Sequence, residues 1–136
     1  MNAPPPLRAA ERRALLAQAR AVRRNAYAPH SRFRVGAAVL DERGRVHVGC
    51  NVENASFGLT VCAERNAVAA AVAAGARQVR AVAVVTSTRP AASPCGACRQ
   101  VLSEFATPTT PVILASPSGP SEEMPLGQLL PRSFSL

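Results

Sequence analysis

The chain has 136 residues, nearly half of them apolar, which is the usual size of one domain with a single packed core. We therefore expect one domain over residues 1–136. The formal net charge is +8 and all sixteen basic residues are arginines; in a lysine-free chain rich in Ala, Arg, Pro and Val, this indicates a compositional bias of the source genome more than selection for a polyanionic partner. The longest apolar stretch, residues 67–76, is too short to cross a bilayer, and the first residues lack the apolar core of a signal peptide, so we expect a cytoplasmic protein without membrane association.

The first predicted element is a helix over residues 7–26, where apolar residues recur at intervals of three and four. Six arginines crowd it: Arg8, Arg12, Arg13, Arg20, Arg23 and Arg24. A basic helix can bind nucleic acid, but no aromatic side chains alternate with these arginines to stack on bases. We interpret the helix as a solvated face and expect no nucleic-acid partner; salt-dependent retention on heparin would test the alternative.

Strands and helices then alternate to the end of the chain. An antiparallel hairpin is predicted over 33–40 and 45–50, and the non-periodic loop after it leads into a buried helix over 61–74, which Gly75 ends. In chain order the remaining elements are a central strand over 79–85, a helix over 95–105, a strand over 111–115 and a last short helix over 126–130. A short fifth strand near 122–125 is also expected, although periodicity alone does not indicate it. Crossovers in the second half predict parallel pairing there.

Cys95 and Cys98 are three residues apart at the start of a predicted helix, so both thiols project from one face. Alone, this P-C-x-x-C string is shared by zinc knuckles and redox motifs. The sequence offers no second C-x-x-C or H-x-H pair for a structural zinc site, and the strand context of a thioredoxin-like motif is missing. Another residue must complete the site.

Cys62 stands where a loop meets a predicted helix, and Glu64 follows two residues later. Helix N-termini stabilise thiolates, so two helix starts facing each other can gather Cys62, Cys95 and Cys98 around one Zn²⁺. Three protein ligands leave a fourth position for water, as in a catalytic zinc site. The spacing turns Glu64 away from the direction of Cys62, so we expect it to act as general base and not as a ligand.

Three further side chains are potential ligands. Cys50 would close the metal site if it bound there, but it lies at a strand end and we interpret it as a buried free thiol. His47 belongs to an alternating strand and His30 to a loop. We expect neither histidine to be a ligand.

Four strings occur together in the sequence: G-C-N-V-E-N-A-S at 49–56, C-A-E-R at 62–65, P-C-G-A-C-R-Q at 94–100 and L-L-P-x-S-F at 129–134. The general pattern of a ligand two residues before a catalytic Glu, with P-C-x-x-C downstream, belongs to zinc deaminases as a class. Taken together, the four strings resemble the small homotetrameric cytidine deaminases. The resemblance covers nearly the whole chain from Tyr27 onward.

The resemblance implies a fold, an assembly and a set of substrate contacts. The fold is a three-layer α/β/α sandwich with a mixed five-stranded sheet, one Zn²⁺ is bound per subunit, and the assembly is a homotetramer with shared active sites. Phe33 would pack by the pyrimidine ring, Asn51 and Glu53 would bind the sugar 3′-hydroxyl, and the backbone around Ala63 and Ser93 would read the base edge. Phe134 would reach a neighbouring subunit's site. Read alone, Phe33 is equally a core residue, and Asn51 and Glu53 a turn-capping pair.

Arg65 matches the family position that hydrogen-bonds the ligand sulfurs. Zn²⁺ with three thiolates is net negative, which weakens it as a Lewis acid, and a nearby positive charge offsets this. We expect Arg99 to be structural or interfacial. His30, Phe57 and Asn66 depart from the residues usual in the family, which affects subunit contacts or substrate preference.

The sequence thus predicts zinc-dependent hydrolytic deamination of cytidine and 2′-deoxycytidine to uridine and 2′-deoxyuridine, with release of ammonia, in pyrimidine salvage. An alternative is deamination of another aminopyrimidine nucleoside, such as blasticidin S, by the same groups. A zinc-stabilised nucleic-acid-binding module would explain the positive charge. It would not explain a zinc site with only three protein ligands or the position of Glu64 beside it. The free nucleoside is the partner we expect.

Overall fold

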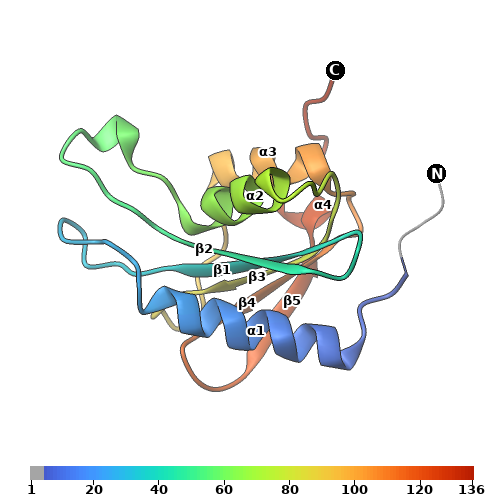
Figure 1. Ribbon diagram of the computed structural model, residues 1–136, viewed down its shortest axis with the longest axis horizontal. Helices are drawn as coiled ribbons and strands as arrows, with labels where there is room; N and C mark the ends of the chain where they lie inside the picture. The colour runs from blue at the N-terminus through green and yellow to red at the C-terminus, as the bar shows by residue number, and fades with distance from the viewer. Residues whose placement is uncertain (1–4) are drawn as a thin grey trace.

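The computed structural model describes residues 5–136, so the first four of the residues considered for a signal peptide lie outside it. A five-stranded sheet is the centre of the molecule, with helices on both faces (Figure 1). In chain order the elements are α1 (Ala9–Arg23), β1 (Gly36–Asp41), β2 (Val46–Cys50), the 3₁₀ helix η1 (Phe57–Leu59), α2 (Ala63–Ala73), β3 (Val79–Val85), α3 (Gly96–Phe105), β4 (Pro111–Ala115), β5 (Ser121–Pro125) and α4 (Leu126–Leu129).

The sheet is mixed, with the strand order β2-β1-β3-β4-β5. Strand β3 pairs in parallel with β4, and the other neighbouring pairs are antiparallel. The β3–α3–β4 connection is therefore a crossover of the predicted kind. Helix α2 makes a second one, because it carries the chain from β2 over β1 to β3. The two crossovers place the starts of α2 and α3 near each other.

Two apolar clusters, one on each face, hold the layers together. Leu15 and Ala19 of α1 pack with Leu40 and Ile113 on one face. Helices α2, α3 and α4 cover the other face, where Leu102 is fully buried among sheet residues (Figure 1). The predicted three-layer α/β/α class with a mixed five-stranded sheet is confirmed.

Two glycines let α1 and α2 lie directly on the sheet. A Cβ on Gly36 would lie 2.1 Å from the carbonyl oxygen of Ala19 in α1. A Cβ on Gly49 would lie 2.5 Å from the carbonyl oxygen of Ala63 and 2.4 Å from the amide nitrogen of Ala67. Because backbone atoms cannot move aside locally, only glycine fits at these two positions. The Gly49 contact fixes the first turn of α2 against β2.

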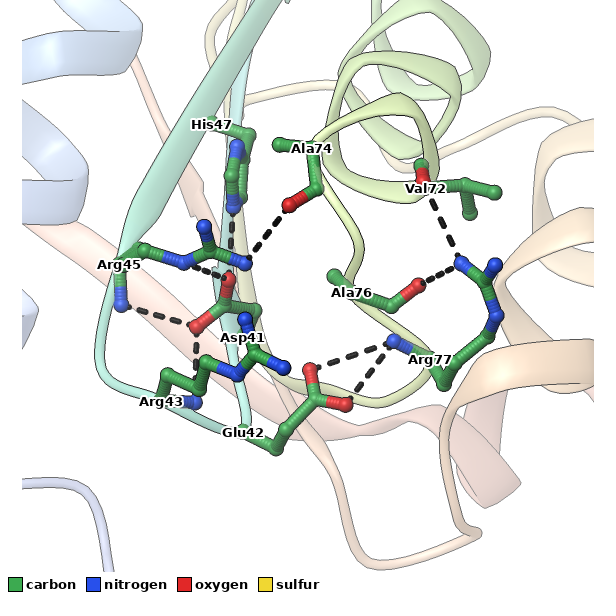
Figure 2. A network of polar contacts seen from close by, with 9 residues as sticks. All are labelled: Asp41, Glu42, Arg43, Arg45, His47, Val72, Ala74, Ala76 and Arg77. Atoms are coloured by element: carbon green, nitrogen blue, oxygen red, sulfur yellow. Dashed lines mark hydrogen bonds and ion pairs between the residues drawn. The ribbon is translucent and has the colours of Figure 1, made fainter.

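A polar network joins the hairpin turn to the end of α2 (Figure 2). The buried Asp41 carboxylate accepts hydrogen bonds from the backbone N–H of Arg43 and Arg45 and from Arg45 Nε, and His47 Nε2 lies 2.8 Å from Asp41 Oδ2. Arg45 Nη2 in turn donates to the carbonyl of Ala74 at 3.1 Å. Burial of Asp41 opposes its ionisation, but the hydrogen bonds from His47 and from the backbone of Arg45 and Arg43 outweigh this and lower its pKa to about 2.

The arginines of α1 fasten the helix to the rest of the fold. Arg20 donates to the carbonyls of Ser116 and Gly119, and Arg12 forms an ion pair with Glu123 of β5. Arg23 Nε donates to the carbonyl of Arg34 at 3.0 Å. Arg12, Arg20 and Arg23 of the basic helix therefore have a structural role.

Among the described residues, no helix combines the length and apolar character that crossing a membrane requires.

Candidate metal centre and substrate cavity

The starts of α2 and α3 bring three thiols to one point. Cys62 is the N-cap of α2, Cys95 is the N-cap of α3, and Cys98 lies in the first turn of α3. The Cys62 and Cys95 sulfurs are 3.9 Å apart, and those of Cys95 and Cys98 are 3.5 Å apart. Three sulfurs bound tetrahedrally to Zn²⁺ at about 2.3 Å would be about 3.8 Å apart. The donor set therefore fits zinc. Among the residues that the structure describes, these three cysteines form the one group of three or more possible ligands close enough together to hold a metal ion.

The surroundings of Cys62 favour its thiolate. Hydrogen bonds from Cys98 and from Arg65 lower the pKa of the Cys62 thiol to about 5, against the effect of burial. Cys98 is buried and shares a proton with Cys62, which raises its pKa above the usual range. Opposite shifts in neighbouring thiols are expected when they share one negative charge. A divalent cation relieves this repulsion and binds all three in the deprotonated form.

Arg65 lies beside the metal-binding group. Its Nη2 is 3.6 Å from the Cys62 sulfur and 3.4 Å from the carbonyl oxygen of Thr60, and its Nε is buried without a hydrogen-bond partner. Arg99 is different, because its guanidinium holds the carbonyls of Pro94 and Leu129 at 2.7 and 2.6 Å. Arg99 therefore fastens α3 to the C-terminal segment.

Glu64 occupies a buried position one residue into α2. Its side chain is 5% exposed, and it lines the same cavity as Cys62 and Cys95. Burial raises the pKa of the Glu64 carboxyl, and the nearby charge of Cys62 acts in the same direction. A buried carboxyl with a raised pKa, next to a metal-binding group, is suited to accept and return a proton.

The cavity has a volume of about 180 Å³ and lies at the carboxyl end of β3, between the starts of α2 and α3. Its walls are largely apolar, with a few polar groups, as is usual for a small-molecule site. The lining residues are Phe33, Val35, Asn51, Thr60, Cys62, Ala63, Glu64, Val84, Thr86, Ala92, Ser93 and Cys95.

Four of the substrate-binding residues predicted from the sequence lie in this lining: Phe33, Asn51, Ala63 and Ser93. The Asn51 side chain is partly engaged, because its Oδ1 accepts the backbone N–H of Val35 at 2.8 Å and its Nδ2 donates to the carbonyl of Phe33 at 2.7 Å. A side-chain amide carries two donor hydrogens and two acceptor lone pairs. Asn51 therefore retains one donor for a ligand while it holds the Phe33 backbone in place.

Glu53 and Phe134 lie elsewhere. The Glu53 carboxylate accepts hydrogen bonds from the backbone N–H of His30 and from the N–H and hydroxyl of Ser31. Phe134 is 72% exposed on the C-terminal tail, where its carbonyl accepts a hydrogen bond from Gln100. Their predicted substrate contacts stay predictions.

Cys50 and the two histidines are not part of the thiol group. The Cys50 carbonyl accepts a hydrogen bond from Asn66 of α2 at 2.8 Å, so Asn66 helps to hold the strand end that precedes Asn51. His47 is engaged with Asp41, and the His30 ring makes an edge contact with Phe57. Two of the residues that depart from the family pattern, His30 and Phe57, thus contact each other.

Sequence reasoning missed several residues of the cavity wall, among them Thr60, Thr86 and Ala92. One signal was available for Thr86. It directly follows an apolar run that predicts a buried strand, and ligands of α/β folds bind outside the carboxyl ends of the strands. Ala92 gave no comparable signal, because small residues in a loop carry no pattern.

Three cysteines that can hold a metal ion, a buried carboxyl beside them and a small adjoining cavity are the parts expected of a zinc-dependent hydrolytic deaminase. Residues 9–114, more than three quarters of the chain, match the family described as the cytidine and deoxycytidylate deaminase zinc-binding region. The chain belongs to this family. Zinc is its cofactor, and the resemblance inferred from the motifs is confirmed.

Several relatives align with nearly the whole chain. A cytidine deaminase of Sporosarcina psychrophila is 47% identical over 121 residues, which are 89% of each chain. One from Halalkalibacterium halodurans is 46% identical over 125 residues, 92% of this chain and 95% of the relative. The crystal structure of a cytidine deaminase from Burkholderia pseudomallei superimposes with a TM-score of 0.85 at 49% identity, covering 90% of this chain and 98% of the other.

Proposed function

We propose that the protein catalyses the hydrolytic deamination of cytidine and 2′-deoxycytidine to uridine and 2′-deoxyuridine, with release of ammonia, as a step of pyrimidine salvage. The observation that carries this proposal is the position of Glu64: a buried carboxyl in the same small cavity as Cys62 and Cys95. Relatives that share nearly half of the sequence over most of its length are cytidine deaminases.

In this mechanism Cys62, Cys95 and Cys98 hold the zinc and Glu64 moves the protons. When bound, Zn²⁺ acts as a Lewis acid that lowers the pKa of water toward neutrality. Glu64 accepts a proton from the attacking water and delivers it to the ring N3 as the C4–O bond forms. It then takes the proton of the new C4 hydroxyl and gives it to the amino group, which leaves as ammonia when the C4–N bond breaks and the C4 carbonyl forms. The raised pKa of Glu64 suits both roles, because the carboxyl must gain and lose a proton in each turnover.

The substrate contacts belong to the same proposal. Phe33 packs against the pyrimidine ring, the backbone at Ala63 and Ser93 reads the base edge, and Asn51 and Glu53 bind the sugar 3′-hydroxyl. The free donor of Asn51 supports its part. Glu53 accepts three hydrogen bonds from His30 and Ser31, so its carboxylate, which offers about four acceptor sites, has one left for the sugar hydroxyl.

The active unit that we propose is a cytoplasmic homotetramer of single-domain subunits, with residues 1–136 as the domain. In it, Phe134 completes the site of a neighbouring subunit. The exposure of this large apolar side chain on the C-terminal tail, outside the cavity of its own chain, supports that assignment.

Ammonia release from cytidine, measured on protein of known zinc content, tests the function. The Glu64→Gln variant should retain zinc and lose roughly a thousandfold or more in kcat, because its amide cannot accept and return a proton. Glu104→Gln, which changes an exposed glutamate of α3, is the matched control and should keep full activity. Substantial activity of Glu64→Gln would refute the mechanism, and a zinc-loaded wild type that releases no ammonia would refute the function.

A further inference from the structure

The loop between β3 and α3 forms one wall of the substrate cavity. It leaves the sheet at Thr86 and reaches the start of α3 at Cys95, and Thr86, Ala92 and Ser93 all line the cavity. Residues 86–95 contain no helix or strand. Side-chain contacts must therefore fix the shape of this wall.

Thr86 closes the loop onto the end of the sheet. Its backbone N–H donates to the carbonyl of Ala115 at 3.0 Å, which fastens it to the end of β4. Its hydroxyl oxygen accepts the backbone N–H of Ala92 at 3.0 Å and lies 3.1 Å from the hydroxyl of Thr88. Thr86 is only 2% exposed, so this hydrogen bond is largely shielded from water.

Other side chains fix the two ends of the loop. The Ser116 hydroxyl donates to the carbonyl of Thr88 at 3.0 Å, and Arg99 donates to the Ser93 hydroxyl at 2.9 Å and to the Pro94 carbonyl at 2.7 Å. The backbone N–H of Ala92 donates its hydrogen bond to the Thr86 hydroxyl. The hydroxyl of Thr86 thus sets how far the Ala92 segment stands from the sheet.

We propose that Thr86 is a positioning residue for substrate binding, whose hydroxyl holds the Ala92–Ser93 wall at the distance from Phe33 and Ala63 that a pyrimidine base requires. The inference rests on the proposed function, since it concerns the same cavity. Thr86 acts through Ala92 and does not ligate the metal. Its contribution is the same in the bound substrate and in the transition state, and such a contribution appears in KM and not in kcat.

Thr86→Val tests the proposal, because valine keeps the branched shape and replaces the hydroxyl with a methyl group. The loss of one hydrogen bond should raise KM for cytidine roughly three- to tenfold, with kcat and zinc content within about twofold of the wild type. Thr86→Ser keeps the hydroxyl and should restore KM. A wild-type KM in Thr86→Val, or a KM in Thr86→Ser as high as in Thr86→Val, would overturn the proposal.

Thr110 offers a matched control at the opposite end of the sheet. It is 3% exposed, and its hydroxyl oxygen accepts the backbone N–H of Thr107 at 2.9 Å in the loop before β4. Thr110→Val removes the same kind of hydrogen bond away from the cavity, so it should lower Tm without changing KM. An equal rise of KM in Thr110→Val would show a general effect of destabilisation and overturn the assignment to Thr86.

Amide hydrogen exchange gives a readout that does not depend on activity. The Ala92 amide should exchange faster in Thr86→Val than in the wild type and in Thr110→Val, because its acceptor is gone. Unchanged exchange at Ala92 would overturn this inference while leaving the proposed deamination intact. Absence of ammonia release from the zinc-loaded wild type would instead overturn the proposed function.

Discussion

Arg65 places a positive charge beside the thiol cluster, with its Nη2 3.6 Å from the Cys62 sulfur. Three thiolates around Zn²⁺ leave the centre with a net negative charge, which weakens the metal as a Lewis acid and raises the pKa of water near it. We propose that the half-buried guanidinium shifts this balance back. It also donates to the carbonyl of Thr60 in the cavity wall, so the proposed role is both electrostatic and structural.

Replacing Arg65 with Ala should lower kcat about tenfold while the protein keeps its zinc, because the three ligands remain and only the compensating charge is lost. Zinc content by atomic absorption and kcat by ammonia release measure the two effects. Arg77→Ala serves as the control, since Arg77 binds the carbonyls of Val72 and Ala76 at the far end of α2. An unchanged kcat with full zinc occupancy in Arg65→Ala would contradict the charge argument.

At the scale of elements, the β1–β2 hairpin turn is docked on the end of α2 through one carboxylate. Asp41 satisfies two backbone N–H groups of the turn and contacts Arg45 and His47, while Arg45 continues to the carbonyl of Ala74 (Figure 2). The opposite end of α2 carries Cys62 and Glu64. The network thus holds the helix whose first turn forms the site.

The lowered pKa of Asp41 makes this docking dependent on pH. Its pKa is about 2 in the folded protein against 3.8 as the ordinary value, so ionised Asp41 stabilises the fold above pH 4, and this contribution, about 2 kcal/mol, is lost as the pH falls from 4 through 2. Asp41→Asn should therefore be less stable by at least about this amount at neutral pH, and its difference from the wild type should shrink toward pH 2.

Urea unfolding of both proteins between pH 7 and pH 2 measures that difference. Zinc release in acid affects both proteins alike, so it cancels in the comparison. Glu104→Gln removes an exposed carboxylate and should run parallel to the wild type. A gap between Asp41→Asn and the wild type that stays constant over the whole range would contradict the argument.

Elements with strong periodicity could be predicted from the sequence, and tertiary contacts could not. The strands Val79–Val85 and Pro111–Ala115 have the predicted bounds because polar residues flank both apolar runs. The first helix is shorter than predicted at both ends, and the 3₁₀ helix Phe57–Leu59 lies in a segment without periodicity. In the site, spacing alone paired Cys95 with Cys98, whereas the bond between Thr86 and Ala92 depends on a loop whose path only the folded chain determines.

At the scale of the whole molecule, two of the residues predicted to bind substrate, Glu53 and Phe134, do not line the cavity of their own chain. The C-terminal tail leaves the body beside α3 and α4, and Phe134 on it is exposed (Figure 1). Covering this large apolar side chain with another surface would be favourable. In the proposed homotetramer the neighbouring subunit's cavity supplies that surface, and closed symmetry gives every site one Phe134 from another chain.

Mixing two impaired chains tests this arrangement directly. Glu64→Gln lacks the proton carrier, and Phe134→Ala, which should retain zinc but raise KM, lacks the donated ring. When the two are unfolded together and refolded at equal amounts, random assembly gives about a quarter of the sites both an intact Glu64 and a neighbour's Phe134. Activity at low cytidine concentration should then exceed that of the two variants refolded separately and combined. If each chain supplied Phe134 to its own cavity, mixing would restore no activity, and light scattering of the wild type would separate that outcome from a failure to assemble.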